Sequence, residues 1–292
     1  MRIQTLLLGT LAALSANAQY GTFDAKAVDA AKGTTTLVVL DGGNSPYDKA
    51  LMDAVKAHWK FTGAYDFITV NDLATQPLSE GSTYVMKLRK TDPQKYEGIF
   101  LAVVAGWKQK KNEALVVEGN AVTNVPAEQE LASILFDPDH LVNTNCTGFM
   151  NLYVKHLQDY LKLVSKGEIR DKTTADRTYE GRNRPLRDGL ELWMAEGDLD
   201  KSLPDAAAAK AHYTHGFQVM SAEQLGNAAR EGKAGVALSD VVLTGDHKNK
   251  HCFKRVFNAN TGELMYQADE AALYGKKEGF LDEDLKAIER AR

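Results

Sequence analysis

The pattern of apolar and polar positions in the first part of the chain predicts a strand followed by a helix. Residues Thr36–Leu40 are almost all apolar, which is typical of a strand buried on both faces. A turn-rich stretch, Asp41–Pro46, follows, in which Ser45 suits a helix cap and Pro46 suits a first helical turn. We therefore expect a helix from this point. Its apolar stripe consists of Leu51, Ala54, Val55 and Trp59.

Further β-rich segments follow this helix. Strands are expected at Tyr65–Val70 and Thr83–Leu88, with a helical turn between them that begins near Asn71. Two more β-rich runs, Gly98–Trp107 and Ala114–Glu118, are separated by a lysine-rich segment. This spacing predicts that the two runs pair with each other as a hairpin.

The same order of patterns returns in the second half of the chain. The segment Ala54–Trp59 matches Ala208–Tyr213 at an offset of 154 residues, and Glu80-Gly81 matches Glu231-Gly232 at an offset of 151. The predicted strands before and after these segments recur in the same order. We interpret the pattern as an internal repeat of one α/β unit.

A segment of a different kind lies between the two copies. Its apolar residues fall on one helical face and predict a long amphipathic helix, which needs a partner surface. These residues are Phe149, Leu152, Tyr153, His156, Leu157, Tyr160, Leu161 and Val164. The next stretch, Lys166–Arg187, is polar and is interpreted as a linker or exposed loop. A last helix is expected at Asp282–Arg290.

These elements predict an α/β protein of two tandem related modules, each a small mixed sheet with helices packed on it. The expected division gives residues 19–125 to the first module. Residues 126–187 form a helical connector and polar linker, and residues 188–292 form the second module with its carboxy-terminal helix.

The first 18 residues are typical of a cleavable secretory signal. Arg2 precedes an apolar run, Ile3–Leu14, and the small residues Ala16 and Ala18 suit a signal peptidase, which would leave Gln19 as the new amino terminus. An uncleaved anchor helix is the alternative, but the apolar run is shorter than the ~20 residues that a membrane span needs. We expect an exported protein located in the periplasm or, alternatively, outside the cell.

The charge and apolarity of the chain exclude some classes of partner. Without the signal the chain has 34 basic residues (35 minus Arg2) and 39 acidic residues, a formal charge of −5. Proteins that bind nucleic acid usually carry a basic excess, so no nucleic-acid partner is expected. After the signal, no segment has the length and apolarity of a membrane helix, so no transmembrane segment is expected.

Two cysteines, Cys146 and Cys252, would share an oxidising compartment after export. A disulfide between them would close a long loop and stabilise the fold by about 4–5 kcal/mol in the chain-entropy model. Two buried free thiols are the alternative, because a disulfide needs Cα atoms within ~7 Å of each other.

Each copy therefore consists of a strand, a helix that ends near an aromatic residue, a short strand such as Tyr65–Val70, a short helix, a strand and a β-hairpin. This order resembles the small α/β modules of bacterial periplasmic proteins, including the amino-terminal domain of the TolB type and the curli-export type. It also resembles uncharacterised exported proteins of Gram-negative bacteria with such modules. The resemblance implies an envelope location and contacts with other molecules, and it transfers no catalytic residue.

Two histidines and a cysteine form the most specific candidate for a metal site in the sequence. His247, His251 and Cys252 have a spacing that suits a transition metal, although the lysines between them disfavour a cation. His58 and His212 recur at equivalent places, and a structural role at a helix end is favoured for both. Apart from this metal site, no cofactor is expected.

Motifs for nucleophilic catalysis are missing from the sequence, since it contains neither a Gly-x-Ser-x-Gly elbow nor a Ser-x-x-Lys motif. The glycine-rich turn Asp41–Ser45 lacks the phosphate-loop lysine and is interpreted as a plain turn. Whether the protein is an enzyme stays open, with no catalysis as the favoured interpretation.

The favoured hypothesis is an exported binding or envelope-assembly protein. It would contact a partner protein or an envelope component through its sheet edges and an arginine-rich stretch. The residues of this expected partner surface are Arg177, Arg182, Arg184 and Arg187. The alternatives are a metal-dependent hydrolase with Asp246, His247 and His251 between the modules, and a small-ligand carrier whose cleft involves Trp59, Trp107 and Trp193.

Overall fold

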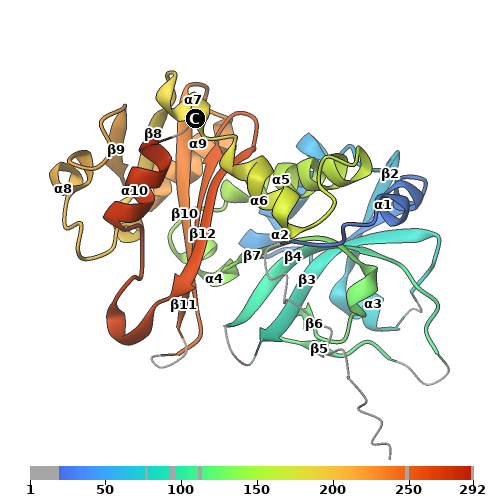
Figure 1. Cartoon of the computed structure of the whole chain (residues 1–292). Helices are drawn as coiled ribbons and strands as arrows, with labels where there is room; N and C mark the ends of the chain where they lie inside the picture. Colours follow the sequence, from blue (N-terminus) through green and yellow to red (C-terminus); the bar gives the residue numbers. More distant parts are fainter. Residues whose placement is uncertain (1–19, 76–77, 93–95, 111–113, 247–249, 291–292) are drawn as a thin grey trace, which may run out of the picture.

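The computed structural model describes residues 20–75, 78–92, 96–110, 114–246 and 250–290. The predicted signal at residues 1–18 and His247 lie outside the described residues. Within them the protein is α/β, with two mixed sheets that lie side by side and a long helix, α5, between them (Figure 1). The predicted α/β class is confirmed.

The first sheet has the strand order β2-β1-β3-β4-β7. Strand β1 is parallel to both β2 and β3, whereas β3, β4 and β7 are successively antiparallel. A short hairpin of β5 and β6 is attached to β3. The bounds are β1 Thr35–Leu40, β2 Ala64–Thr69, β3 Ser82–Asp92, β4 Tyr96–Ala105, β5 Val117–Glu118, β6 Ala121–Val122 and β7 Glu130–Phe136.

The second sheet has the strand order β12-β11-β10-β8-β9. Strand β8 is parallel to β9 and β10, and β10, β11 and β12 are successively antiparallel. Written from the other edge, the order is β9-β8-β10-β11-β12, which corresponds strand by strand to β2-β1-β3-β4-β7 of the first sheet. The strand directions correspond as well. The bounds are β8 Glu191–Ala195, β9 Phe217–Met220, β10 Val236–Thr244, β11 His251–Asn258 and β12 Leu264–Ala271.

Helices cover both sheets and fill the space between them (Figure 1). Those of the first half are α1 Ala25–Lys32, α2 Pro46–His58, α3 Val70–Thr75, α4 Pro138–Asn143 and α5 Phe149–Ser165. Those of the second half are α6 Lys172–Glu180, α7 Arg184–Arg187, α8 Ala206–Lys210, α9 Ala222–Glu231 and α10 Asp282–Glu289. Short 3-10 turns occur at Ala127–Gln129, Glu196–Asp198 and Leu273–Gly275.

Helix α2 begins where the sequence predicts. The Ser45 hydroxyl accepts a hydrogen bond from the backbone N–H of Asp48 at 3.0 Å, and the Asp48 carboxylate accepts one from the backbone N–H of Ser45 at 3.2 Å. This reciprocal capping box satisfies two amides that a helix start leaves without partners. Residues within the first turn therefore account for the start of α2.

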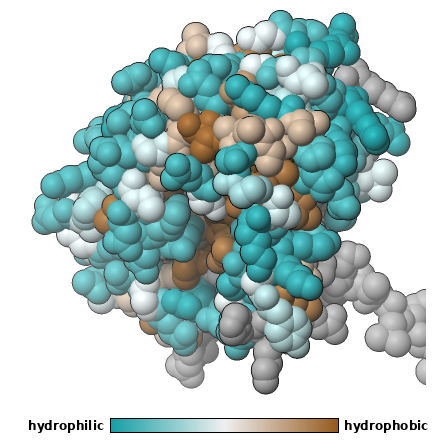
Figure 2. Space-filling model, turned by 90° about the vertical axis from the view of Figure 1, so that its left-hand side faces the viewer, coloured by the Kyte–Doolittle hydropathy of each residue, from teal (hydrophilic) through white to brown (hydrophobic). Residues whose placement is uncertain are grey.

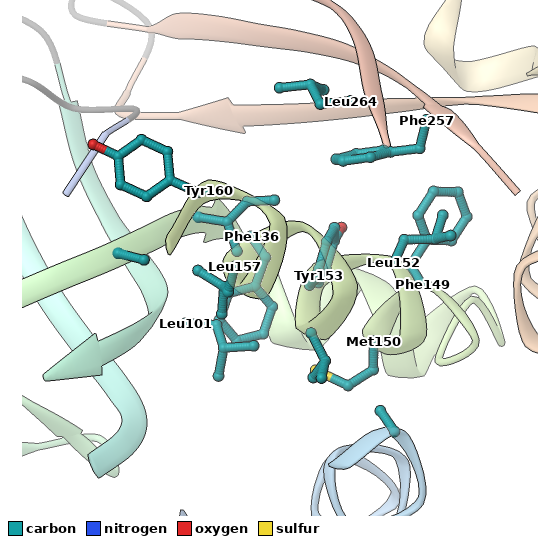
Figure 3. Close-up of a cluster of buried hydrophobic side chains, with 14 of the residues drawn as sticks. Leu101, Phe136, Phe149, Met150, Leu152, Tyr153, Leu157, Tyr160, Phe257 and Leu264 are labelled. Carbon is teal, nitrogen blue, oxygen red and sulfur yellow. The ribbon is translucent and has the colours of Figure 1, made fainter. Parts of the chain in front are cut away.

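Helix α5 is the centre of the main hydrophobic core. Leu101 and Phe136 of the first sheet reach it from one side, and Phe257 and Leu264 of the second sheet reach it from another (Figure 3). The Tyr153 ring lies 6.0 Å from the ring of Phe136 and 6.2 Å from that of Phe257. One continuous core thus joins the two sheets.

Two glycines allow the start of α5 to approach α9 closely. A Cβ on Gly226 would lie 2.7 Å from Cys146 Cα, and one on Gly148 would lie 1.9 Å from the carbonyl oxygen of Gly226. Real side chains do not tolerate such distances, so the backbones would have to separate. Glycine at these positions is a packing requirement.

Replacing Gly226 by alanine should therefore lower the free energy of unfolding by about 1–3 kcal/mol, the usual range for an overpacked site. Alanine is the better helix former by ~1 kcal/mol, so a loss of stability would reflect the crowding. Urea unfolding measures the effect, and Gly63→Ala, where a Cβ meets no atom within 4 Å, is the control. Equal stability of the two variants would contradict the assignment.

Three sequence predictions about chain organisation are wrong. Gly98–Trp107 and Ala114–Glu118 do not pair, because β4 pairs with β3 and β7, whereas β5 pairs with β6. Lys166–Arg187 is not a linker, since it contains α6 and α7 with buried apolar side chains. The boundary at residue 125 precedes β7, which completes the first sheet. Pairing and burial depend on distant segments, which local polarity does not report.

The possible disulfide between Cys146 and Cys252 is not formed, and both cysteines are free and buried. The Cys146 thiol donates to the carbonyl oxygen of Ala222 in α9 at 2.8 Å, whereas Cys252 lies within β11. Burial raises the pKa of both thiols, that of Cys252 to about 12. The alternative interpretation, two buried free thiols, describes this structure.

Candidate binding groove

A groove on the second half of the molecule runs between α6, β12 and α10. We call it the α6–β12 groove. It encloses about 690 Å³, a volume in the range of ligand sites. Its walls are α6 with Gly181 and Asn183, residues 266–269 of β12, and Ala287 and Arg290 at the end of α10.

Helix α6 is positioned by its own sequence and by two buried residues. Asp171 caps it, accepting a hydrogen bond from the backbone N–H of Thr174 at 2.8 Å. Ala175 and Tyr179, four residues apart, occupy one face and are buried. The Tyr179 ring stacks on Tyr20 at 6.2 Å and meets His156 of α5 at 5.8 Å. This packing holds the helix against the core and leaves its other face along the groove.

Two buried polar atoms of the groove lining have no protein partner among the described residues. Tyr179 is 1% exposed and its hydroxyl makes no hydrogen bond, and Asn183 is 7% exposed and its Oδ1 accepts none. Burial, with the nearby Asp159 carboxylate, raises the pKa of Tyr179, so the hydroxyl remains a donor. Buried polar groups normally have hydrogen-bond partners, so we expect a ligand or a water molecule to bind these two atoms.

The amino-terminal segment is bound into one end of the groove wall. The Tyr20 hydroxyl donates to Asp176 Oδ1 at 2.6 Å and accepts a hydrogen bond from the Gln267 side chain of β12. Lys172 adds an ion pair with Asp176 at 2.6 Å. These contacts connect Tyr20, α6 and β12. Three segments that are distant in sequence therefore form this wall of the groove.

Strand β12 is an edge strand, and its hydrogen-bond pattern orients part of its backbone outward. The N–H of Ala272 donates to the carbonyl oxygen of Lys250 at 2.8 Å. Along an antiparallel ladder, residue pairs that exchange backbone hydrogen bonds alternate with pairs that do not. Counting from Ala272, the pair Ala268–Lys254 exchanges backbone hydrogen bonds, and the next pair, Gln267–Arg255, does not. The N–H and C=O of Gln267 therefore point to the open edge, where Gln267 also lines the groove.

The four arginines of the expected partner surface lie in different environments. Arg177 is exposed and lines the groove. Arg182 forms an ion pair with Asp159 of α5, with both side chains about 20% exposed. Arg184 and Arg187 pair with Asp188 at 3.3 and 2.9 Å on the exposed α7. Of the four, Arg177 is the one that lines the α6–β12 groove.

The expected metal ligands do not converge in the described residues. His251 and Cys252 are consecutive in β11, so their side chains leave opposite faces of the sheet. His251 Nε2 lies 2.8 Å from Asp269 Oδ2, and no group of three metal-ligating side chains occurs within the described ranges. His247, the third expected ligand, and the tip beside Asp246 lie outside them.

The repeated histidines and the tryptophans occupy separate places. His58 is the last residue of α2, and burial with the nearby charges of Lys155 and Lys60 lowers its pKa. His212 follows α8. Trp59 donates to the hydroxyls of Thr36 and Thr62, Trp193 donates to Glu191, and Trp107 lies in a second core cluster. The tryptophans therefore do not line one cleft.

Sequence reasoning missed Tyr179, Asn183 and the open edge of β12. A signal for α6 was present, because Asp171 and Thr174 have capping spacing and Ala175 and Tyr179 recur at four residues. No local signal marks Asn183, since its burial follows from packing.

The surface beside the second sheet is mainly hydrophilic. On the face that includes β9 and α8, apolar side chains show in a hollow at the centre and in a smaller area above it (Figure 2). No helix in the described part of the chain combines the length and apolarity needed to cross a bilayer.

The fold and the groove define an α/β protein of two mixed sheets with a concave site beside an open strand edge. Comparisons with protein-family models, with curated proteins and with solved structures gave no match. The resemblance to TolB-type and curli-export modules therefore stays a prediction.

Proposed function

We propose that this chain is an exported, non-enzymatic binding protein whose α6–β12 groove takes an extended segment of a partner protein. The observation that carries the proposal is that Tyr179 and Asn183, each with a buried polar atom that has no partner, line the groove together with residues 266–269 of the edge strand β12. A peptide backbone offers both an acceptor and a donor for such a pair. It also adds main-chain hydrogen bonds to a free strand edge, a recurring mode of peptide recognition.

The charges around the groove fit a polar partner segment. The charged side chains of the lining are three cations and three carboxylates: Lys172, Arg177, Arg290, Asp176, Glu180 and Asp269. Exposed charges at a rim contribute mainly to orientation and association rate. We expect them to set the direction in which the segment lies along β12.

Two further features support the proposal: the secretory pattern at the start of the chain and the similarity of the two sheets. The secretory pattern of residues 1–18 supports a periplasmic location, with release from the cell as the alternative. The common strand order of the two sheets supports their origin from one repeated unit. A duplicated scaffold with one groove is consistent with a role in contacting an envelope partner.

A peptide library selected on the immobilised protein tests the function. Selected peptides should bind the Tyr179→Phe variant about two- to tenfold more weakly, the usual effect of one hydrogen bond. Tyr213→Phe is the matched control, because Tyr213 is also buried with an unpartnered hydroxyl but does not line the groove. Hydrogen exchange should show protection of the Gln267 amide in the complex.

Two results would contradict the proposal. One is that no selected peptide distinguishes Tyr179→Phe from Tyr213→Phe. The other is that peptides bind without any added protection in β12. A parallel Arg177→Glu variant, with the exposed Arg184→Glu as its control, reports whether the rim charge steers binding.

A further inference from the structure

A second pocket lies at the carboxyl ends of the parallel strands of the first sheet. We call it the β1–β3 pocket; it encloses about 340 Å³ between the β1–α2 turn, β3, the β5–β6 turn and α4. Val38 and Leu40 of β1 share a core cluster with α2, whereas Val39 clusters with α3. The two helices thus cover opposite faces of the sheet. Ligands of open α/β sheets bind where connections diverge in this way.

The backbone amides of the β1–α2 turn are already used. The Asp48 carboxylate accepts hydrogen bonds from the N–H groups of Asp41 at 2.7 Å, Gly42 at 3.2 Å, Gly43 at 2.8 Å and Ser45 at 3.2 Å. Although burial opposes it, these bonds lower the pKa of Asp48. These amides of the turn therefore bind an internal anion, the Asp48 carboxylate, and are not free to bind a ligand in the pocket.

Three side chains supply hydrogen-bond donors to the pocket. Lys87 and Arg89, two residues apart on β3, share one face of the strand. Lys87 Nζ lies 2.6 Å from Asp41 Oδ1 and 4.5 Å from the centre of the Tyr47 ring. Burial, then the Asp41 and Asp48 carboxylates, raise the pKa of Tyr47, so its hydroxyl keeps its proton.

Two of these donors are buried without an acceptor in the described structure. They are the Tyr47 hydroxyl, in a residue that is 5% exposed, and the Arg89 Nε. Arg89 Nη1 pairs with Glu97 at 3.1 Å. Leaving a donor buried and unpaired is costly, and an arginine Nε–H can only donate. These two donors therefore lack an acceptor, and the buried Asp41 Oδ1, which makes no hydrogen bond, is already ion-paired with Lys87.

We propose that the β1–β3 pocket binds a small organic carboxylate. Its two oxygens would accept hydrogen bonds from the Tyr47 hydroxyl and from Arg89 Nε. A single negative charge fits better than the double charge of phosphate, because Lys87 is paired with Asp41, Arg89 is paired with Glu97, and Asp139 also lines the pocket. This assignment is independent of the α6–β12 groove.

Calorimetry on the full mature chain tests this assignment. The probes are acetate, lactate and glycine, with inorganic phosphate and glycerol as comparisons. At least one carboxylate should bind with a Kd below about 1 mM. The Tyr47→Phe variant, which loses only a hydroxyl, should bind it about tenfold more weakly. Arg89→Gln should weaken binding to a similar extent, and the matched control Tyr213→Phe should bind as the wild type does.

The outcomes separate the assignment from its alternatives. Binding of phosphate without any carboxylate would overturn the ligand class. Absence of binding by every probe, or equal affinities of Tyr47→Phe and Tyr213→Phe, would overturn the site. Circular dichroism confirms folding of each variant, and the Tyr47→Phe comparison decides the matter if Arg89→Gln does not fold.

Discussion

Replacing Lys254 by methionine is expected to lower the free energy of unfolding by about 3–5 kcal/mol, the usual loss when one partner is removed from a buried ion pair. Lys254 lies in β11 and is fully buried. Its ammonium group pairs with Glu270 of β12 and Asp284 of α10. Methionine keeps most of the side-chain volume but leaves the Asp284 carboxylate, which is 9% exposed, without its cation.

The contacts around Asp284 explain why the loss of the Lys254 ammonium group should also affect α10. The Tyr266 hydroxyl donates to Asp284 Oδ1 at 2.6 Å, and the backbone N–H of Leu281 donates to Oδ2 at 2.8 Å. Asp284 therefore connects β12, the start of α10 and Lys254. Without the lysine, we expect α10 to loosen from the second sheet.

Urea unfolding with a matched lysine variant measures this effect. Lys277 pairs with the same Glu270 at 2.6 Å, but its side chain is 52% exposed. Lys277→Met should therefore cost less than about 1 kcal/mol. Adding Glu270→Gln and Asp284→Asn to Lys254→Met should recover part of the stability, because no buried charge is left. If Lys254→Met and Lys277→Met lose equal stability, the buried network does not have the proposed importance.

The second large effect is expected at Asp198, where an asparagine should make the protein less sensitive to rising pH. Asp198 lies in the 3-10 turn Glu196–Asp198 that follows β8, and its carboxylate accepts a hydrogen bond from the Ser239 hydroxyl. Burial is the main cause that raises its pKa to about 7, and the nearby Asp240 carboxylate acts in the same direction. The hydrogen bonds oppose this shift but do not cancel it.

The sign of the pH dependence follows from the raised pKa. The folded protein holds the Asp198 proton more tightly than the unfolded chain does, whose aspartates titrate at about pH 3.9. The stability due to this proton is complete below that pH and is lost as the pH rises through about 7. A difference of about three pKa units corresponds to about 4 kcal/mol as an upper value.

Thermal unfolding at about pH 5 and about pH 8 tests this expectation. The wild-type melting temperature should fall between the two conditions by more than that of Asp198→Asn. The exposed Asp53→Asn is the control and should follow the wild type. Because wild type and variant share all other titrating groups, the difference between their two slopes reports Asp198 alone. Parallel slopes would show that Asp198 stays ionised in the folded protein.

Local patterns determined a large part of this fold. Ser45 and Asp48 cap α2, the apolar run at Thr36–Leu40 forms β1, and the stripe from Phe149 to Val164 forms α5. Caps and periodicity depend on residues within one or two turns, so the sequence reports them directly. The similar order of elements in the two halves is visible in the same way.

The tertiary structure alone decided which segments pair and which polar atoms lose water. Sequence could not tell that β4 pairs with β3 and β7, because strand pairing depends on residues far along the chain. Nor could it tell that Tyr47 and Tyr179 have unpartnered hydroxyls, since burial of a single atom is a property of the packed fold. Both candidate sites depend on such atoms, and for this reason the sequence by itself left them unseen.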